Sequence, residues 1–174
     1  MKPILLQQEL LSLTHFCVIV PTYNNHKTLK KVLDSVLDYT SNVIIVNDGS
    51  TDETSEILKS YSHLTQIHHP KNLGKGRALR NGFRKAIETG FEYAVTIDSD
   101  GQHFAADIPN FIAEIQKEPN SLLIGSRNMT QENVPKKSSF GNKFSNFWFQ
   151  FETGIKLDDT QSGFRLYPLQ LLPK

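Results

Sequence analysis

The chain has 174 residues, of which 38% are hydrophobic and 21% charged, a balance that is typical of one globular domain with a sizeable core and unlike that of a disordered chain. Lysine and arginine together number 19 against 18 aspartate and glutamate residues, which argues against a dominant nucleic-acid-binding surface but allows a local basic patch. Cys17 is the single cysteine, so an intramolecular disulfide is excluded, and no stretch approaches the roughly 20 apolar residues of a membrane span.

The two ends of the chain differ from its middle. Residues 1–15 are expected to form an N-terminal extension with leucines at helical spacing, and Glu9 interrupts the apolar run that a signal peptide would need. Residues 16–174 are expected to form the main domain. Leu169–Lys174 looks like the beginning of a further element, so we expect a longer parent protein.

The first predicted elements alternate between strand and helix. The apolar run Phe16–Val20 predicts a strand, and the helical spacing of Thr28–Tyr39 predicts a helix. Asn42–Val46 is the next predicted strand. Ser50–Glu53 reads as a capping box, which predicts a helix from there to about residue 60.

The same alternation continues along the chain. Leu64–His68 predicts a weaker strand, Gly74–Thr89 a helix and Tyr93–Ile97 a fourth strand. Ala106–Lys117 predicts another helix and Leu122–Ser126 a fifth strand. Strands that are apolar on both faces and separated by helices imply an α/β fold, with an open, mostly parallel, Rossmann-like sheet and helices on both faces.

Ligands of such sheets bind at the carboxyl ends of the strands. Four polar clusters follow predicted strands and are therefore expected to meet at one rim: Pro21–Asn24, Asn47-Asp48, Asp98–Gln102 and Ser126-Arg127. Asp98 and Asp100 stand out among them because residues i and i+2 of an extended chain point the same way, so both carboxylates can face one hard cation such as Mg²⁺ or Mn²⁺. The alternative is an Asp-rich turn that ends a strand.

The motifs of this rim resemble those of family 2 glycosyltransferases, and within them the polyprenyl-phosphate sugar synthases of the dolichol-phosphate mannose synthase type. The segments that carry the resemblance keep one order along the chain: Val18–Asn24, Val46–Asp52, Asn72–Gly76, Asp98–His103, Gly125–Arg127 and Asp159–Arg165. The resemblance implies the GT-A fold, and residues 16–174 then form the catalytic domain.

The resemblance also implies a role for individual residues on the donor side. Pro21, Tyr23 and Asn25 match the nucleotide pocket, and Asp48 matches a carboxylate that accepts a hydrogen bond from the base, although it could instead support its own turn with Gly49. Lys75 and Arg77 follow Gly74 at a predicted helix start, where they would bind phosphate or remain solvated.

Asp98 and Asp100 match the pair that holds the divalent cation and through it the donor, and Gln102 matches a further oxygen ligand. On the acceptor side, Asp159 matches an acid, with Asp158 as the neighbouring alternative. A cation at this pair would neutralise the departing diphosphate.

Two arginines are further phosphate-binding candidates. Arg127 would hold a phosphate or form an exposed salt bridge. Arg165 would pair with an acceptor phosphate or tie down its own turn.

The function implied is an inverting, metal-dependent transfer of a sugar from UDP- or GDP-sugar to an acceptor, expected to be a polyprenyl phosphate. Transfer to a saccharide hydroxyl is the alternative, and a non-catalytic nucleotide-sugar-binding module is a rival. A nucleotidyltransferase is disfavoured because Pro21–Asn25 lacks a phosphate-cradling glycine. The chain is expected in the cytoplasm or at the inner face of the membrane, with no nucleic-acid partner.

The aromatic residues of Phe140–Phe151 predict a helix that covers the core or, alternatively, meets lipid.

Overall fold

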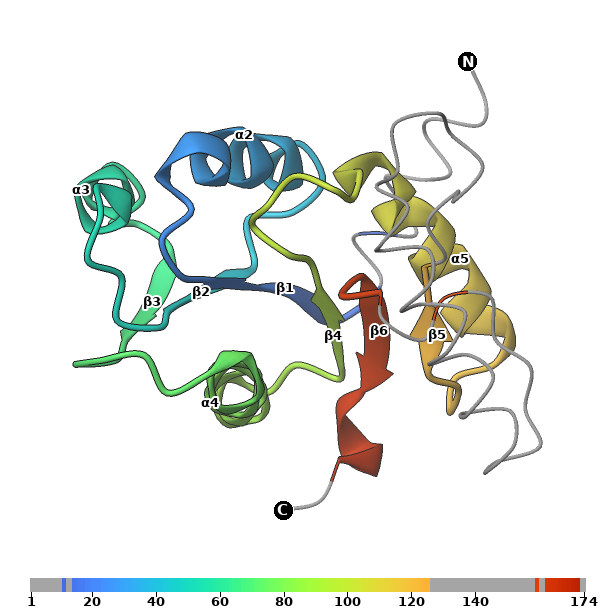
Figure 1. Cartoon of the computed structure of the whole chain (residues 1–174). Helices are drawn as coiled ribbons and strands as arrows, with labels where there is room; N and C mark the ends of the chain where they lie inside the picture. The colour runs from blue at the N-terminus through green and yellow to red at the C-terminus, as the bar shows by residue number, and fades with distance from the viewer. Residues whose placement is uncertain (1–10, 12–13, 126–158, 160–161, 173–174) are drawn as a thin grey trace.

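Six strands form one sheet in the order β3-β2-β1-β4-β6-β5 (Figure 1). The computed structural model describes residues 11, 14–125, 159 and 162–172. Strands β1 to β4 run parallel, whereas β6 pairs antiparallel with both β4 and β5. The strands span Phe16–Thr22 (β1), Val43–Asn47 (β2), Thr65–His68 (β3), Tyr93–Thr96 (β4), Leu123–Ile124 (β5) and Arg165–Pro168 (β6).

Helices cover both faces of this sheet. The helices α2, α3 and α5 contribute to one apolar cluster, and α4 contributes to a second cluster on the opposite face (Figure 1). Their bounds are His26–Leu37 (α2), Thr54–Lys59 (α3), Lys75–Thr89 (α4) and Ile108–Lys117 (α5), with short 3₁₀ helices at Ala105–Asp107 (η1) and Leu169–Leu171 (η2). The predicted open, mostly parallel α/β sheet is confirmed.

Strand β1 shows why its apolar run has no polar alternation. Val18 and Val20 pack into the cluster under α2, whereas Cys17 and Ile19 pack into the cluster under α4. Burial raises the pKa of the Cys17 thiol to about 12, which makes it the inert core residue that the sequence predicts.

The predicted capping box at Ser50–Glu53 is wrong. Helix α3 begins at Thr54, three residues after Thr51, which would be the first helical residue with Ser50 as its cap. The Oγ atom of Ser50 accepts a hydrogen bond from the backbone N–H of Asn24, and the carboxylate of Asp52 accepts one from the backbone N–H of Thr54. The helix start is displaced because Ser50 contacts another loop instead of its own helix.

Strand β6 is an element that the strand patterns do not predict. It pairs Thr96 with Arg165 and Tyr93 with Pro168 in the antiparallel direction. Its neighbour β5 is shorter than the predicted strand Leu122–Ser126. The sheet therefore continues past β4 through a strand taken from the end of the chain.

Several predictions lie outside the described residues. They concern most of the extension 1–15, Arg127, Asp158 and the aromatic segment Phe140–Phe151. Within the described part of the chain, no helix combines the length and the apolar character that crossing a membrane requires.

Candidate functional site

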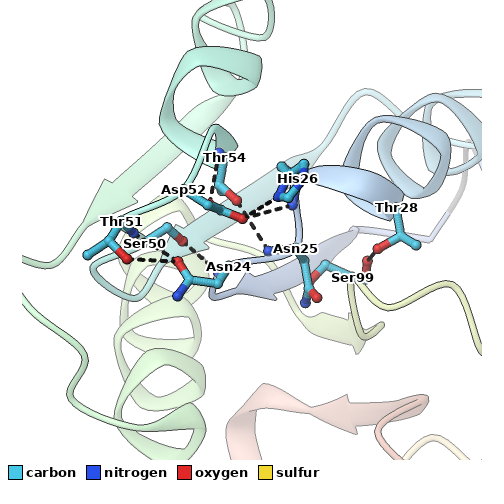
Figure 2. A network of polar contacts seen from close by, with 9 residues as sticks. All are labelled: Asn24, Asn25, His26, Thr28, Ser50, Thr51, Asp52, Thr54 and Ser99. Carbon is cyan, nitrogen blue, oxygen red and sulfur yellow. Dashed lines mark hydrogen bonds and ion pairs between the residues drawn. The ribbon is translucent and has the colours of Figure 1, made fainter.

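Three loops meet where β1, β2 and β4 end, as the parallel sheet predicts. Figure 2 shows side chains of the β1–α2 loop, of the loop before α3 and of the loop after β4 in one polar network. Asn24, with a φ of 52°, donates from its backbone N–H to Ser50 Oγ at 3.0 Å and accepts at Oδ1 from the N–H of Thr51 at 2.8 Å. Loops that are far apart in the sequence are thus joined by hydrogen bonds.

Asp52 joins two helix N-termini within this network. Its carboxylate accepts hydrogen bonds from the backbone N–H of His26 at 3.2 Å, from that of Thr54 at 3.0 Å, and contacts His26 Nδ1 at 2.7 Å (Figure 2). Burial raises the pKa of Asp52, but the hydrogen bonds from Thr54 and His26 lower it by more, so the net pKa lies well below its usual value. The carboxylate therefore favours the folded state when ionised.

Asp52→Ala is expected to lower the free energy of unfolding at neutral pH by about 1–2 kcal/mol, as the loss of a helix cap does. Because the folded-state pKa is depressed, this stabilisation is present above the unfolded-state pKa of about 3.9 and is lost as the pH falls towards the folded-state pKa. Urea unfolding at neutral and acidic pH measures the effect, with Asp52→Asn as the control that keeps one acceptor oxygen. A difference between parent and Asp52→Ala that does not shrink in acid would contradict the prediction.

Ser99 holds the Asp98-Ser99-Asp100 turn from inside. Its side chain is buried, with 1% exposed, and its Oγ accepts a hydrogen bond from Asn25 Nδ2 at 2.7 Å. Its carbonyl oxygen accepts one from Thr28 Oγ1 at 2.6 Å (Figure 2). The buried middle residue leaves Asp98 partly exposed and Asp100 exposed on either side of it.

Asp98 lies between a lysine and a backbone turn. Lys75 Nζ, on the first residue of α4, contacts its two carboxylate oxygens at 2.6 and 2.8 Å. On another side Gly163 is so close that a Cβ there would lie 2.0 Å from Asp98 Oδ2. The Gly163 turn is held by Thr96 Oγ1, which donates to the Gly163 carbonyl at 2.8 Å.

Asp48 is buried and accepts three hydrogen bonds from within the chain. Its Oδ1 accepts hydrogen bonds from His69 Nδ1 at 2.6 Å and from the Leu73 N–H at 2.9 Å, and its Oδ2 accepts one from the Gly74 N–H at 2.9 Å. Burial raises the pKa of Asp48, but these hydrogen bonds lower it by more, so the net pKa is below its usual value. Three of the roughly four lone-pair sites of this carboxylate are therefore occupied within the chain, and Oδ2 keeps one.

His69 extends the contact into helix α4. Asn81 Nδ2 lies 2.8 Å from His69 Nε2, and since the amide nitrogen donates, the imidazole carries its proton on Nδ1 and donates that to Asp48. Asp48 in turn holds Gly74, the residue before Lys75. Asp48 and Asp98 therefore belong to the same rim, connected through the Gly74-Lys75 step.

The remaining donor-side candidates occupy distinct positions. Tyr23 is 43% exposed, so its ring is accessible, whereas Pro21 is buried and Asn25 points its amide at Ser99. Asp100 accepts a hydrogen bond at Oδ1 from the Gln102 N–H at 3.0 Å, and both residues are exposed. Among the described residues, no three His, Cys, Asp or Glu side chains are grouped to hold a metal ion. Binding of a divalent cation by Asp98, Asp100 and Gln102 stays a prediction.

The acceptor-side candidates lie partly within the described residues. Asp159 is 1% exposed, and Arg165 donates from Nε to the carbonyl of Ser162 at 2.7 Å. That hydrogen bond fits the expectation that Arg165 ties down its own turn. Binding of the acceptor phosphate by Arg165 stays a prediction. Arg127 lies outside the described part.

Three contributors to the rim were not identified from sequence. Ser99 joins the acidic turn to Asn25, Gly163 lies against Asp98, and His69 follows β3, whose carboxyl end reaches the same rim as β1, β2 and β4. Applying the rim rule to the weakest predicted strand, Leu64–His68, would have found His69. Gly163 had no comparable signal, because its role depends on a contact with a residue far away in the chain.

Residues 17–173 match the family model described as glycosyl transferase family 2. The chain belongs to glycosyl transferase family 2. One relative in this family is the UDP-N-acetylglucosamine–dolichyl-phosphate N-acetylglucosaminyltransferase of Methanococcus voltae, which is 32% identical over 170 residues. That match covers 86% of this chain and 68% of the relative.

A second relative is the human dolichyl-phosphate beta-glucosyltransferase, 32% identical over 179 residues, with 86% of this chain and 53% of the human protein covered. The chain thus spans about half to two thirds of the length of these family members.

Among solved structures, glucosyl-3-phosphoglycerate synthase of Mycobacterium tuberculosis with Mn²⁺, UDP-glucose and phosphoglyceric acid has a TM-score of 0.68 at 21% identity. The match covers 95% of this chain and 60% of that one. The likeness shows the fold, and the expected GT-A fold of this family 2 member is confirmed.

Proposed function

We propose that this chain transfers a sugar from a nucleoside-diphosphate sugar to a polyprenyl phosphate, with inversion and with Mg²⁺ or Mn²⁺ as cofactor. The observation that carries the proposal is the pairing of Asp98 with Lys75 at the rim, next to buried Asp48 and Ser99. The two relatives named above differ in the sugar but share dolichyl phosphate in their names, which favours a lipid phosphate over a saccharide hydroxyl as acceptor.

The residues at the acidic turn fit a hard divalent cation. Asp98, Asp100 and Gln102 offer oxygen ligands and no sulfur or imidazole, and two carboxylates leave room for the diphosphate. When bound there, the cation would neutralise charge on the leaving diphosphate. Lys75 balances Asp98 in this structure, and its ammonium would be free to turn to the donor phosphates once Asp98 is otherwise neutralised.

The chain's own groups would orient the two substrates. Tyr23 would lie against the base, and Arg165, with Arg127, would hold the acceptor phosphate. An oxygen of that phosphate attacks the anomeric carbon, the bond from this carbon to the donor diphosphate breaks, and the nucleoside diphosphate leaves with the electron pair. Because the attacking oxygen is already anionic, Asp159 would orient the acceptor instead of removing a proton.

A thermal-shift panel tests the donor half of the proposal. We expect UDP- or GDP-sugars, compared with dTDP-sugars, to raise the melting temperature of the chain in the presence of Mn²⁺ and much less without it, since a ligand that binds the folded state stabilises it. Transfer of labelled sugar to a short polyprenyl phosphate, against a saccharide acceptor, tests the other half. Donor binding without transfer or hydrolysis would instead favour the non-catalytic module.

Gly163→Ala is expected to remove the response to Mn²⁺ while the protein stays folded. The added Cβ would lie 2.0 Å from Asp98 Oδ2, so the carboxylate must leave its position before the backbone does. Gly76→Ala is the matched control, because a Cβ at that helical position meets nothing within 4 Å. The measurement is the Mn²⁺-dependent shift of both variants with donor; an unchanged shift in Gly163→Ala would contradict the role of Asp98.

A further inference from the structure

One side of helix α4 carries a row of three arginines. Arg77, Arg80 and Arg84 follow one another at intervals of three and four residues, which places them in line along the helix, and all three are exposed. The opposite side of α4, with Ala78, Gly82 and Ala86, is buried. The row therefore faces away from the sheet, on the face that α4 and the short η2 cover (Figure 1).

The charges of this row are not neutralised within the described part of the chain. The ion pairs found there involve other cations, including Lys30 with Asp34 and Lys75 with Asp98. Glu88, one turn beyond Arg84, is exposed and forms no ion pair with it among the described residues. Within residues 14–125 and 162–172, the three guanidinium groups thus have no carboxylate partner.

Apolar side chains lie at both ends of the row. Leu73 is 43% exposed at the end near Lys75, and Ile87 is 48% exposed at the other end. Ile87 borders a hollow of about 370 Å³, and the other residues that line it are mostly apolar: Phe91, Glu92, Tyr93, Leu169, Gln170 and Leu172. Leu171, beside this hollow in sequence, is 56% exposed.

We propose that this face of α4, from Leu73 through the three arginines to Ile87, docks on an anionic lipid bilayer. Arginine binds lipid phosphates in a bidentate way, and exposed leucine and isoleucine beside cations suit the boundary between headgroups and acyl chains. A nucleic acid would use the charges but not the apolar ends, and the chain as a whole carries only +1. Docking along α4 would bring its first residue, Lys75, and with it Asp98, to headgroup level.

The test is co-sedimentation of the full chain with vesicles of phosphatidylcholine containing about 30% phosphatidylglycerol, and with pure phosphatidylcholine. Arg77→Gln/Arg80→Gln/Arg84→Gln is compared with Lys27→Gln/Lys30→Gln/Lys31→Gln, which removes the same three charges from α2 on the other face of the sheet. Both variants change the net charge from +1 to −2, that is 1 − 3. Circular dichroism checks that both are folded.

We expect the α4 variant to bind anionic vesicles about fivefold more weakly per arginine, on the order of 100-fold in all, and the α2 variant within about threefold of the parent. High salt is expected to weaken the binding of the parent chain to anionic vesicles. Ile87→Ser is expected to weaken the vesicle binding that persists at high salt.

Three results would overturn the proposal. The first is that the parent chain does not bind anionic vesicles. The second is that the two triple variants lose vesicle binding equally. The third is that a duplex oligonucleotide binds in an arginine-dependent way while vesicles do not bind. Since no donor or acceptor is present, the result is independent of whether the chain transfers sugar.

Discussion

Asp100→Ala is expected to reduce sugar transfer on the order of 100- to 1,000-fold, because a cation at the leaving diphosphate contributes several kcal/mol to the transition state. The side chain is exposed, so its removal should leave the fold intact. The same variant should lose the Mn²⁺-dependent rise in melting temperature. Both quantities are measured with the donor that gives the largest shift in the panel.

Glu88→Ala is the control for this experiment. It removes an exposed carboxylate near the opposite end of α4, without an ion pair in the described structure, and should transfer sugar as the parent does. A transfer rate of Asp100→Ala within about twofold of the parent would place any cation away from the acidic turn, since such a change amounts to less than about 0.5 kcal/mol.

Asp48→Ala is expected to lower the free energy of unfolding by about 3 kcal/mol or more, because it leaves three buried or part-buried donors without their acceptor. Asp38→Ala removes an exposed aspartate, which has no side-chain hydrogen bond or ion pair in the described structure, and should change stability by less than about 1 kcal/mol. Urea unfolding of both variants at neutral pH measures the difference. Equal losses in the two variants would show that the contacts of Asp48 do not stabilise the fold.

The effect of Asp48 should also depend on pH. Its folded-state pKa lies below its usual value, so the carboxylate stabilises the fold above the unfolded-state pKa of about 3.9, and this contribution is lost as the pH falls below it. The gap in stability between parent and Asp48→Ala should therefore narrow in acid. Lys75, one residue beyond Gly74, should at the same time lose its fixed position beside Asp98.

Most of the sheet and its rim could be predicted from sequence because the central strands β1, β2 and β4 are mainly apolar and are followed by polar residues. Val18 and Ile19 pack on opposite faces, which is why the run shows no alternation. The rule that loops meet at the carboxyl ends of parallel strands then brought Asp48 and Asp98 to one edge.

The parts that could not be predicted depend on partners that local patterns do not reveal. Ser50 and Asp52 can both accept hydrogen bonds at a helix start. The contact of Asp52 with Thr54 goes together with a contact of Ser50 to Asn24, in the β1–α2 loop, and of Asp52 to His26, the first residue of α2. Strand β6 consists of four residues whose pairing partner is distant in the chain. Whether Asp48 contacts a base or its own chain likewise depends on His69 and on the backbone of the segment before α4.

Strand β6 has a consequence for how the protein is made. Thr96 and Arg165, which face each other across β4 and β6, are 69 positions apart, so β4 is an unprotected edge for much of synthesis. The parallel unit β1 to β4 emerges from the ribosome first, yet the turn at Gly163 that contacts Asp98 arrives near the end of this chain. A nascent chain stalled before Gly163 is therefore expected to hold an ordered sheet with an incomplete acidic turn, and to need chaperone protection at β4.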